Sequence, residues 1–189
     1  MNVSLSTVIL AGGKSSRMGR DKALIEIDGI PLLKRTCDAA RHCTDLIYVV
    51  TSWRDRYQSI ISDVHWIEES SPRSPLIGFA EALAQVSTEW VLLLACDLPR
   101  LDGETLQQWT AQLSEAPILV ARSQEGWEPL FGFYGRDRLS SLQNYIAQGK
   151  RSFQDWLDSE SVQELEIVDR QVLLNCNTPD DLKLIDESY

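Results

Sequence analysis

The sequence predicts an α/β fold in three layers, with a mostly parallel central sheet and helices on both faces. Apolar runs rich in β-branched residues alternate with stretches of helical periodicity, a pattern typical of strand–helix–strand units. One run, Trp90–Ala95, is apolar throughout, as expected of a strand that is buried on both sides. The connections between the runs are long enough for the crossovers that parallel strands require.

The individual elements follow from local signals. The expected strands are residues 4–10, 46–51, 64–67, 90–95, 117–121 and 130–134. The expected helices are residues 32–43, 76–86, 103–113 and 138–146, and a last helix that begins at Thr178. Pro31 suits the start of the first helix, and Pro179, Asp180 and Asp181 suit the first turn of the last one.

Charge and length exclude several classes of protein. The chain has 189 residues and a formal net charge of −10. A nucleic-acid-binding protein needs a basic face to neutralise phosphates, and a protein that docks on an anionic membrane needs basic clusters. We therefore expect neither nucleic acid nor a membrane as a partner. The length suits one domain, residues 1–189.

The sequence shows no targeting pattern and no metal-binding cysteine pattern. No basic stretch is followed by an apolar signal segment, and no apolar run approaches spanning length, so we expect a cytoplasmic protein. No two cysteines have CxxC spacing, and neither histidine lies near a cysteine pair. Reduced, partly buried thiols are expected at the four positions, Cys37, Cys43, Cys96 and Cys176.

Polar residues follow each of the first four predicted strands. In an open α/β sheet, ligands bind at the carboxyl ends of the strands. The segments that would meet there are residues 11–22, then Thr51 and Ser52, then Glu68 and Glu69, and finally Cys96 and Asp97. The sequence therefore predicts a binding site at this edge.

The segment LAGGKSSRMGRDK, residues 10–22, is the strongest signal for a phosphate ligand. Its glycines let backbone N–H groups approach an anion without a Cβ in the way. It holds four basic residues against one acidic residue, although the whole chain is strongly acidic. This concentration of positive charge favours a bound phosphate over an ordinary glycine turn with solvated charges.

Two common phosphate-binding patterns do not fit the segment. The Walker A pattern requires Gly-Lys and then Ser or Thr at its end, but Gly19 is followed by Arg20. The dinucleotide fingerprint G-x-G-x-x-G is not present either. A P-loop ATPase and a Rossmann dehydrogenase are therefore disfavoured.

Asp97 is the second signal, because it follows the fully apolar strand and precedes Leu98 and Pro99. A carboxylate at such a strand end can hold Mg²⁺, which takes one or two carboxylates together with substrate phosphate oxygens. Taken alone, Asp97 fits a turn or cap residue better. Its combination with the glycine-rich segment favours the metal site.

Together these residues resemble the molybdenum cofactor guanylyltransferases, the MobA family. The similarity includes LAGGKSSRMGRDKALIEIDGIPLL, Glu69, Pro75-Leu76-x-Gly78, Cys96-Asp97-Leu98-Pro99, Glu128-Pro129-Leu130 and Asn175-Cys176-Asn177-Thr178-Pro179. Relatives that transfer other nucleotides tend to read Leu-Ala-Ala-Gly at the start of the first motif. The resemblance implies a Rossmann-like nucleotidyltransferase fold, GTP as the donor, Mg²⁺ as the cofactor, and a phosphorylated molybdopterin or molybdenum cofactor as the acceptor.

The resemblance also implies roles for single residues. The residues that would cradle the nucleotide are Leu10, Ala11, Gly12 and Gly13, with Thr51 and Glu69 serving its base and ribose. Lys22 would contact the phosphates, Arg17 would stabilise the transferring group, and Asp97 would bind Mg²⁺. Thr51, Glu69 and Ser74 stand where the family often has Asn, Asp and Gly.

In the same way, the N-terminal half would bind the nucleotide and the C-terminal half the acceptor. Asn175 and Asn177 would contact the acceptor, although asparagines just before a helix fit capping turns equally well. Transient contact with other proteins of cofactor synthesis is also implied. Three alternatives stay open: a cytidylyl- or sugar-1-phosphate nucleotidyltransferase of the same fold, a non-catalytic nucleotide-binding module, and a redox dinucleotide-binding protein.

Overall fold

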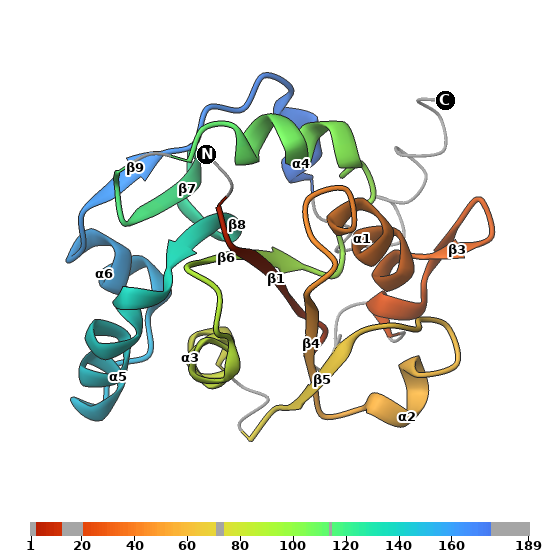
Figure 1. Ribbon diagram of the computed structural model, residues 1–189, viewed down its shortest axis with the longest axis horizontal. Coiled ribbons are helices and arrows are strands. Elements are labelled where there is room, and N and C mark those ends of the chain that lie inside the picture. The colour runs from red at the N-terminus through yellow and green to blue at the C-terminus, as the bar shows by residue number, and fades with distance from the viewer. Residues whose placement is uncertain (1–2, 13–20, 71–73, 114, 175–189) are drawn as a thin grey trace.

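The computed structural model describes residues 3–12, 21–70, 74–113 and 115–174, and in this part of the chain the central sheet has seven strands. Their order is β5-β4-β1-β6-β8-β7-β9 (Figure 1). The strands are β1 Leu5–Leu10, β4 Ile47–Thr51, β5 His65–Glu68, β6 Trp90–Ala95, β7 Ile118–Ser123, β8 Gly126–Gly135 and β9 Val162–Glu164. The first four are parallel, β8 is antiparallel to β6 and β7, and β9 is parallel to β7. The prediction of a mostly parallel sheet is confirmed.

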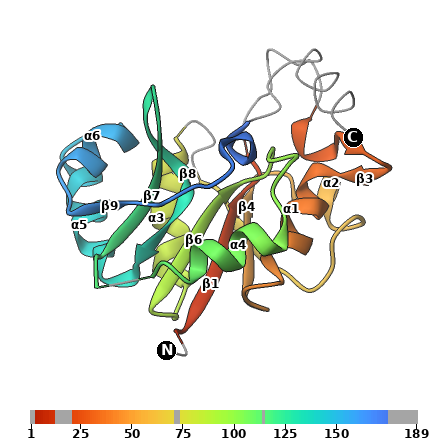
Figure 2. The same ribbon diagram turned by 90° about the horizontal axis from the view of Figure 1, so that it is seen from above.

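Helices cover both faces of this sheet, as Figures 1 and 2 show. One face carries α1 (Leu32–Ala40) and α4 (Gly103–Thr110), and the other carries α3 (Pro75–Gln85), α5 (Leu139–Ala147) and α6 (Phe153–Asp158). The short elements are η1 Lys22–Leu24, β2 Glu26–Ile27, β3 Ile30–Pro31, α2 Arg54–Tyr57, η2 Arg136–Arg138 and η3 Arg170–Leu173. The predicted three-layer arrangement is therefore confirmed.

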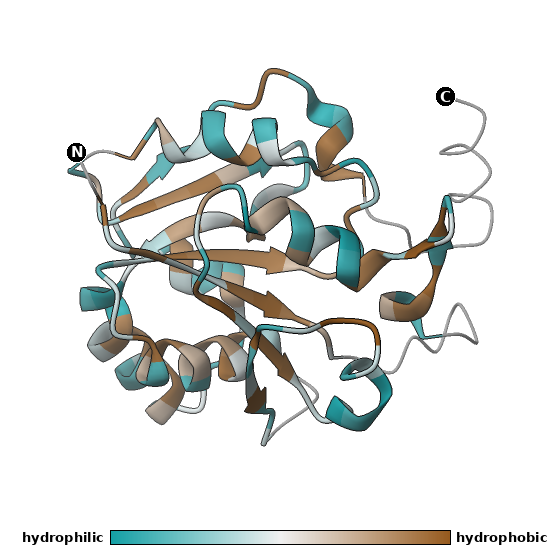
Figure 3. Cartoon of the chain, turned by 45° about the vertical axis from the view of Figure 1, so that its right-hand side comes forward, coloured by the Kyte–Doolittle hydropathy of each residue, from teal (hydrophilic) through white to brown (hydrophobic). Residues whose placement is uncertain are grey.

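Two apolar clusters, one on each face, hold the layers together. Leu33 and Cys37 of α1 pack with Trp109 of α4 in the first cluster, and Phe79 of α3 packs with Trp156 of α6 in the second. Strand β6 is buried at every position, so it supplies side chains to both clusters. In Figure 3 the strands are mostly hydrophobic in colour, whereas the outer sides of the helices are hydrophilic.

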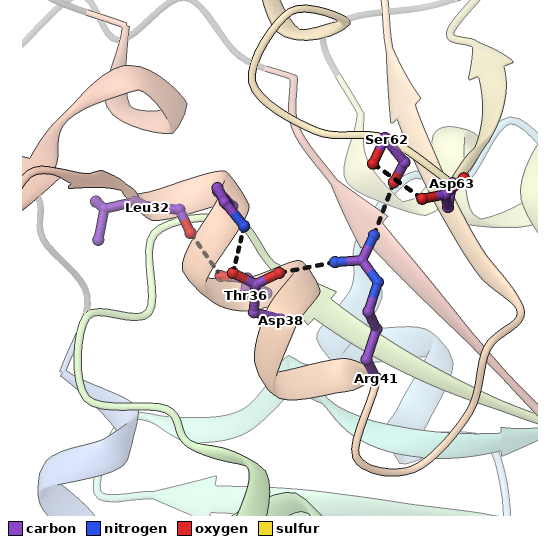
Figure 4. Close-up of polar contacts among 7 residues, drawn as sticks. Leu32, Thr36, Asp38, Arg41, Ser62 and Asp63 are labelled. Atoms are coloured by element: carbon purple, nitrogen blue, oxygen red, sulfur yellow. Dashed lines mark hydrogen bonds and ion pairs between the residues drawn. The ribbon is translucent and has the colours of Figure 1, made fainter.

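The first helix is shorter than predicted, since α1 ends at Ala40 and the expected helix continued to residue 43. The helix ends here because the amides of His42 and Cys43 donate to the carbonyl oxygens three residues back, at Ala39 and Ala40, which tightens the last turn. The guanidinium of Arg41 turns back to Asp38 and out to the loop before β5 (Figure 4). It donates hydrogen bonds of 2.7 Å to Asp38 Oδ1 and of 2.7 Å to the carbonyl oxygen of Ser62. These contacts fix α1 against the loop before β5.

The other differences concern short or polar elements. Strand β8 begins at Gly126, four residues before the predicted strand. The prediction missed this first half because it contains Gly126, Glu128 and Pro129, which do not read as a strand, and it is only half-buried. The expected helices 103–113 and 138–146 are observed as α4 and α5 with slightly different ends. The elements β2, β3, β9, α2 and α6 were not predicted, because each is too short to show a period. The helix expected from Thr178 lies outside the described residues.

Two expectations from composition can also be compared with the structure. In the described ranges no helix combines the length and the apolar character that crossing a bilayer requires. Cys37, Cys43 and Cys96 are free thiols, as expected, and Cys176 lies outside the described residues. Burial raises the pKa of the Cys37 thiol to about 12, which keeps it protonated and unreactive.

Gly132 gives a test of the sheet packing. A Cβ at this position would lie 2.5 Å from the carbonyl oxygen of Leu119 and 2.8 Å from Val120 Cγ2 on the neighbouring strand β7. We expect Gly132→Ala to lower the free energy of unfolding by about 2 kcal/mol, because the backbone oxygen cannot move without breaking the ladder. Urea denaturation measures the change.

Gly78 of α3 is the matched control for this substitution. The nearest atoms to a Cβ there would lie 3.5 Å away, which is ordinary van der Waals contact. Gly78→Ala should leave the free energy of unfolding unchanged or raise it by up to about 1 kcal/mol, since alanine favours a helix over glycine. Equal losses for the two variants would contradict this account of β8.

Candidate active site

The register of the parallel strands brings their carboxyl ends to one edge. Leu10 of β1 is paired with Val50 of β4 on one side and with Ala95 of β6 on the other. The residues that follow each strand therefore emerge level with one another. Among the described residues they line a cavity of about 340 Å³, whose walls are Leu10, Ala11, Gly12, Asp21, Lys22, Ala23, Val50, Trp53, Tyr57, Glu69, Ser74, Pro75, Ala95, Cys96, Asp97 and Leu130.

An ion pair joins the two residues that the sequence singled out for phosphate and metal. Lys22 Nζ of η1 lies 2.9 Å from Asp97 Oδ2, just beyond the end of β6. The two side chains are 20% and 14% exposed, so both are shielded but still reach the cavity. The fold thus places a cation and a carboxylate from positions 75 residues apart at one point.

The backbone around Lys22 is fixed by a cap. Asp21 precedes η1, and its Oδ1 accepts a hydrogen bond of 3.2 Å from the backbone N–H of Ala23. Ala23 is buried against the core, so the turn is held from inside as well. The capped turn fixes the backbone of Lys22, whose side chain reaches Asp97.

Two further residues of the cavity wall each contribute a buried polar atom that has no hydrogen-bond partner among the described residues. They are Glu69 Oε2 and Ser74 Oγ. Burial, reinforced by the charge of Glu81, raises the pKa of the Glu69 carboxyl. Buried polar groups are nearly always paired in folded proteins, and both residues line the same cavity, so a ligand with hydrogen-bonding edges there would satisfy them.

Gly12 creates the space for this carboxylate. A Cβ at position 12 would lie 2.5 Å from Glu69 Oε2, closer than such atoms approach. The side chain of Glu69 can therefore lie over the backbone after β1 only because residue 12 is glycine. Gly12 and Glu69 form one wall of the cavity together.

The structure does not bring every predicted site residue into the cavity. Thr51 is buried, and its hydroxyl accepts a hydrogen bond of 3.0 Å from the backbone N–H of Trp53. It lines an adjoining cavity of about 530 Å³ instead, and its role with the nucleotide stays a prediction. Four other predicted residues, Gly13, Arg17, Asn175 and Asn177, lie outside the described residues.

Sequence reasoning missed several residues that line the cavity. Asp21 was counted only as the one acidic residue of the glycine-rich segment, and its cap signal just before Lys22 could have drawn attention to it. Leu130 occurs in a motif that carried the resemblance, and Ser74 was noted only as a departure from the family pattern, so no role followed for either residue. Trp53 and Tyr57 belong to the unpredicted helix α2 and its start, and no spacing in the sequence points to them.

Comparison with known proteins agrees with this geometry. The family model described as MobA-like NTP transferase domain matches residues 7–164, which run from within β1 to the end of β9 and include all the residues that line the cavity. The chain belongs to this family. Membership makes it a nucleotidyltransferase of α/β, Rossmann-like fold.

Relatives match this MobA-like NTP transferase over nearly their whole length. A Nostoc protein named "Probable molybdenum cofactor guanylyltransferase" is 48% identical and is covered over 92% of its length, with 98% of this chain aligned. The molybdenum cofactor guanylyltransferase of Pseudomonas putida is 35% identical, with 93% of this chain and 94% of the relative aligned. In fold, molybdopterin-guanine dinucleotide biosynthesis protein A of Archaeoglobus fulgidus matches with a TM-score of 0.79 at 21% identity, covering 97% of each chain.

The raised pKa of Glu69 predicts a pH-dependent stability of this MobA-like protein. The unfolded chain releases this proton near the ordinary value of 4.5, whereas the folded chain holds it to higher pH. The free energy of unfolding therefore falls as the pH rises through this interval. We expect Glu69→Gln, which is always neutral, to melt at a higher temperature than the wild type at pH 7.

This difference should shrink at about pH 4, where glutamate is largely protonated in both states. Thermal unfolding at the two pH values measures it. The neighbouring Glu68 is exposed, so Glu68→Gln is the matched control and should change little at either pH. A Glu69→Gln variant that is no more stable than the wild type at pH 7 would mean that the carboxylate already has a partner.

Proposed function

We propose that this chain transfers GMP from GTP to the phosphate of molybdopterin or the molybdenum cofactor, with release of pyrophosphate. The names of the Nostoc and Pseudomonas relatives support both substrates, because a molybdenum cofactor guanylyltransferase transfers a guanylyl group to the molybdenum cofactor. The observation that carries the proposal is the Glu69 carboxylate beside Gly12 in the cavity, whose Oε2 has no hydrogen-bond partner among the described residues. The cytoplasmic location, the roles of the single site residues and the division into a nucleotide half and an acceptor half stay predictions.

The chemistry of the base explains why a carboxylate suits this wall. Guanine presents two adjacent donors, N1–H and the N2 amino group, and a carboxylate accepts two hydrogen bonds side by side. Adenine and cytosine place an acceptor next to their amino group, which would face the negative oxygen of Glu69. Uracil offers one N–H between two carbonyl groups. Of the four bases, guanine alone satisfies both oxygens of Glu69.

Mg²⁺ fits the part of the cavity beside Asp97. In the described residues no three His, Cys, Asp or Glu side chains gather as a closed metal cage. Mg²⁺ does not need one, because it usually takes one or two carboxylates and completes its shell with substrate phosphate and water. Asp97 would hold the ion there, and the ion would supply positive charge against the triphosphate.

The residues present can support the transfer without a general base. The acceptor is a phosphate monoester with a second pKa of about 6, so it is already a dianion and a nucleophile at neutral pH. The barrier comes from bringing anions together and from charge that grows on the α-phosphate. Lys22 presents its ammonium group in the cavity, and Arg17 would add a second cation, so catalysis consists of positioning and electrostatic stabilisation.

Nucleotide selectivity tests the proposal most directly. We expect the wild type to bind GTP with Mg²⁺ more tightly than ATP, CTP or UTP in isothermal titration calorimetry. Glu69→Gln should weaken GTP binding about tenfold, since hydrogen bonds to a charged group are lost, and should change the other three by less than about threefold. The exposed neighbour gives the control, and Glu68→Gln should keep the wild-type preference.

Other outcomes of this titration favour the alternatives. Tighter binding of CTP would keep the fold and the chemistry but make the product a cytidylyl adduct. Binding of no nucleotide, with or without molybdopterin, would indicate a module without catalysis. A pH series shows whether Glu69 contacts the base of the nucleotide. If it does, the ratio of the wild-type affinity for GTP to that of Glu69→Gln should fall at acidic pH, where Glu69 becomes protonated.

Turnover tests the phosphate end of the cavity. We expect Lys22→Ala and Arg17→Ala to lower kcat by about 10³-fold, the loss typical of a phosphate-clamping cation. Asp97→Ala should lose activity that added Mg²⁺ does not restore. Pyrophosphate release from GTP and molybdopterin measures all three.

Lys34 provides the control for these charge deletions. It lies on α1, is 43% exposed and pairs with Asp38 at 2.6 Å, away from the cavity. Lys34→Ala should keep wild-type turnover. Near-normal rates for Lys22→Ala and Arg17→Ala would overturn the proposed roles of both cations.

A further inference from the structure

The buried hydroxyl of Tyr57 contacts the residue that begins the turn of Lys22. Tyr57 is the last residue of α2 and is 1% exposed within the apolar cluster of its face of the sheet. Its hydroxyl lies 3.0 Å from Asp21 Oδ1 and 2.9 Å from Asp21 Oδ2. A phenol has one proton, so it donates to this carboxylate while lying within reach of both oxygens.

The remaining contacts of Asp21 are also made by the protein. Its Oδ1 accepts the hydrogen bond of the Ala23 N–H, and Arg56 Nη1 lies 3.5 Å from its Oδ2. Both oxygens thus face donors of the chain itself. Asp21 lines the same cavity as Asp97, but its carboxylate oxygens contact α2 and the backbone of η1. It therefore links these two elements rather than serving as a second metal ligand.

The turn that Asp21 caps cannot hold its own shape. Helix η1 has three residues, and a single turn fixes several dihedral angles for one hydrogen bond. Its stability must therefore come from the cap and from tertiary contacts. Tyr57 provides a rigid reference, because its ring is packed in the core next to the strands that end at the cavity.

Burial also keeps this donor available. It raises the pKa of the Tyr57 hydroxyl well above its ordinary value, and the hydrogen bond and charge of Asp21 raise it further. The hydroxyl therefore stays protonated at every pH at which the protein would work. The contact does not act as a pH switch but as a permanent support.

We propose that Tyr57 is a positioning residue that holds Lys22 at the nucleotide phosphates through the carboxylate of Asp21. The assignment rests on the proposed function, since it takes Lys22 as the phosphate contact. Small displacements of an electrostatic group cost rate steeply, because the barrier depends on its placement against the transferring phosphoryl group. Tyr57 lies outside the glycine-rich segment and is 1% exposed at the wall of the cavity, and its hydroxyl proton is directed to Asp21.

Tyr57→Phe removes the hydroxyl and leaves the ring in the core. We expect kcat for GTP-dependent pyrophosphate release to fall about tenfold, while the KM for GTP changes by less than about threefold, as for lost orientation rather than lost binding. The matched control is Tyr48→Phe on β4, where the ring stacks on His65 at 4.8 Å between centroids. Within the described residues the Tyr48 hydroxyl makes no hydrogen bond, so this variant should keep the wild-type kcat.

Hydrogen exchange gives a readout that does not depend on activity. The Ala23 amide donates to Asp21, so its exchange should be about tenfold faster in Tyr57→Phe than in the wild type or Tyr48→Phe. Unchanged exchange would show that the hydroxyl does not brace η1 and would overturn the proposal. Faster exchange with an unchanged kcat would overturn it as well, because the turn would then be braced without consequence for Lys22.

A double-variant cycle tests whether Tyr57 acts through Asp21. Asp21→Ala should lower kcat at least as much as Tyr57→Phe, and the double variant should be no worse than Asp21→Ala alone. Additive losses would mean two independent effects and would overturn the proposal.

If Tyr57→Phe fails to fold, Asp21→Asn tests the same contact without changing the core. If exchange differs between the wild type and Tyr57→Phe as predicted, but the wild type shows no GTP turnover, the result would overturn the proposed function instead.

Discussion

The parallel pairing of β1 with β4 and β6 is the constraint on which the site depends. Because Leu10 lies level with Val50 and with Ala95, three separate segments leave the sheet at the same height. Parallel strands have this property, whereas an antiparallel neighbour would send its loop to the opposite edge. The antiparallel strand β8 accordingly reaches the cavity only through Leu130, in the middle of its length.

The cavity stores unfavourable interactions that the sheet must offset. Among the described residues, one buried carboxylate oxygen of Glu69 and the buried hydroxyl of Ser74 have no hydrogen-bond partner, which costs stability, and both residues line the same cavity. Burial of the apolar strands offsets this cost in stability, since β6 is buried at every position and contributes to the clusters on both faces. Polar groups left unsatisfied in the free protein are then ready to discriminate among ligands, because only a matching ligand satisfies them.

How far the sequence predicts this structure depends on how locally each feature is encoded. The strand Trp90–Ala95 was predicted at its observed bounds, because an apolar run of this length is recognisable without its neighbours, whereas the other predicted strands differ from the structure at one end or both. Helix α2 has four residues, too few for a period. The contact between Tyr57 and Asp21 spans 36 positions and exists only once β4 has placed α2 beside η1. Motifs identified Lys22 and Asp97, but only the fold shows that the two side chains meet.

If Asp97 holds the proposed Mg²⁺, the charges of the described cavity residues couple the binding of that ion to the binding of the nucleotide. Among the described lining residues, Lys22 stands against the carboxylates of Asp21, Glu69 and Asp97. These described residues carry a net negative charge, and the one lysine among them is already paired with Asp97 at 2.9 Å. Lys14, Arg17 and Arg20 of the glycine-rich segment lie outside the described residues. A divalent cation on Asp97 would counter both the negative charge and the pairing, since it masks the carboxylate and leaves the ammonium group of Lys22 for the phosphates. By thermodynamic reciprocity, the cation must then raise the affinity for the nucleotide by the same factor as the nucleotide raises the affinity for the cation.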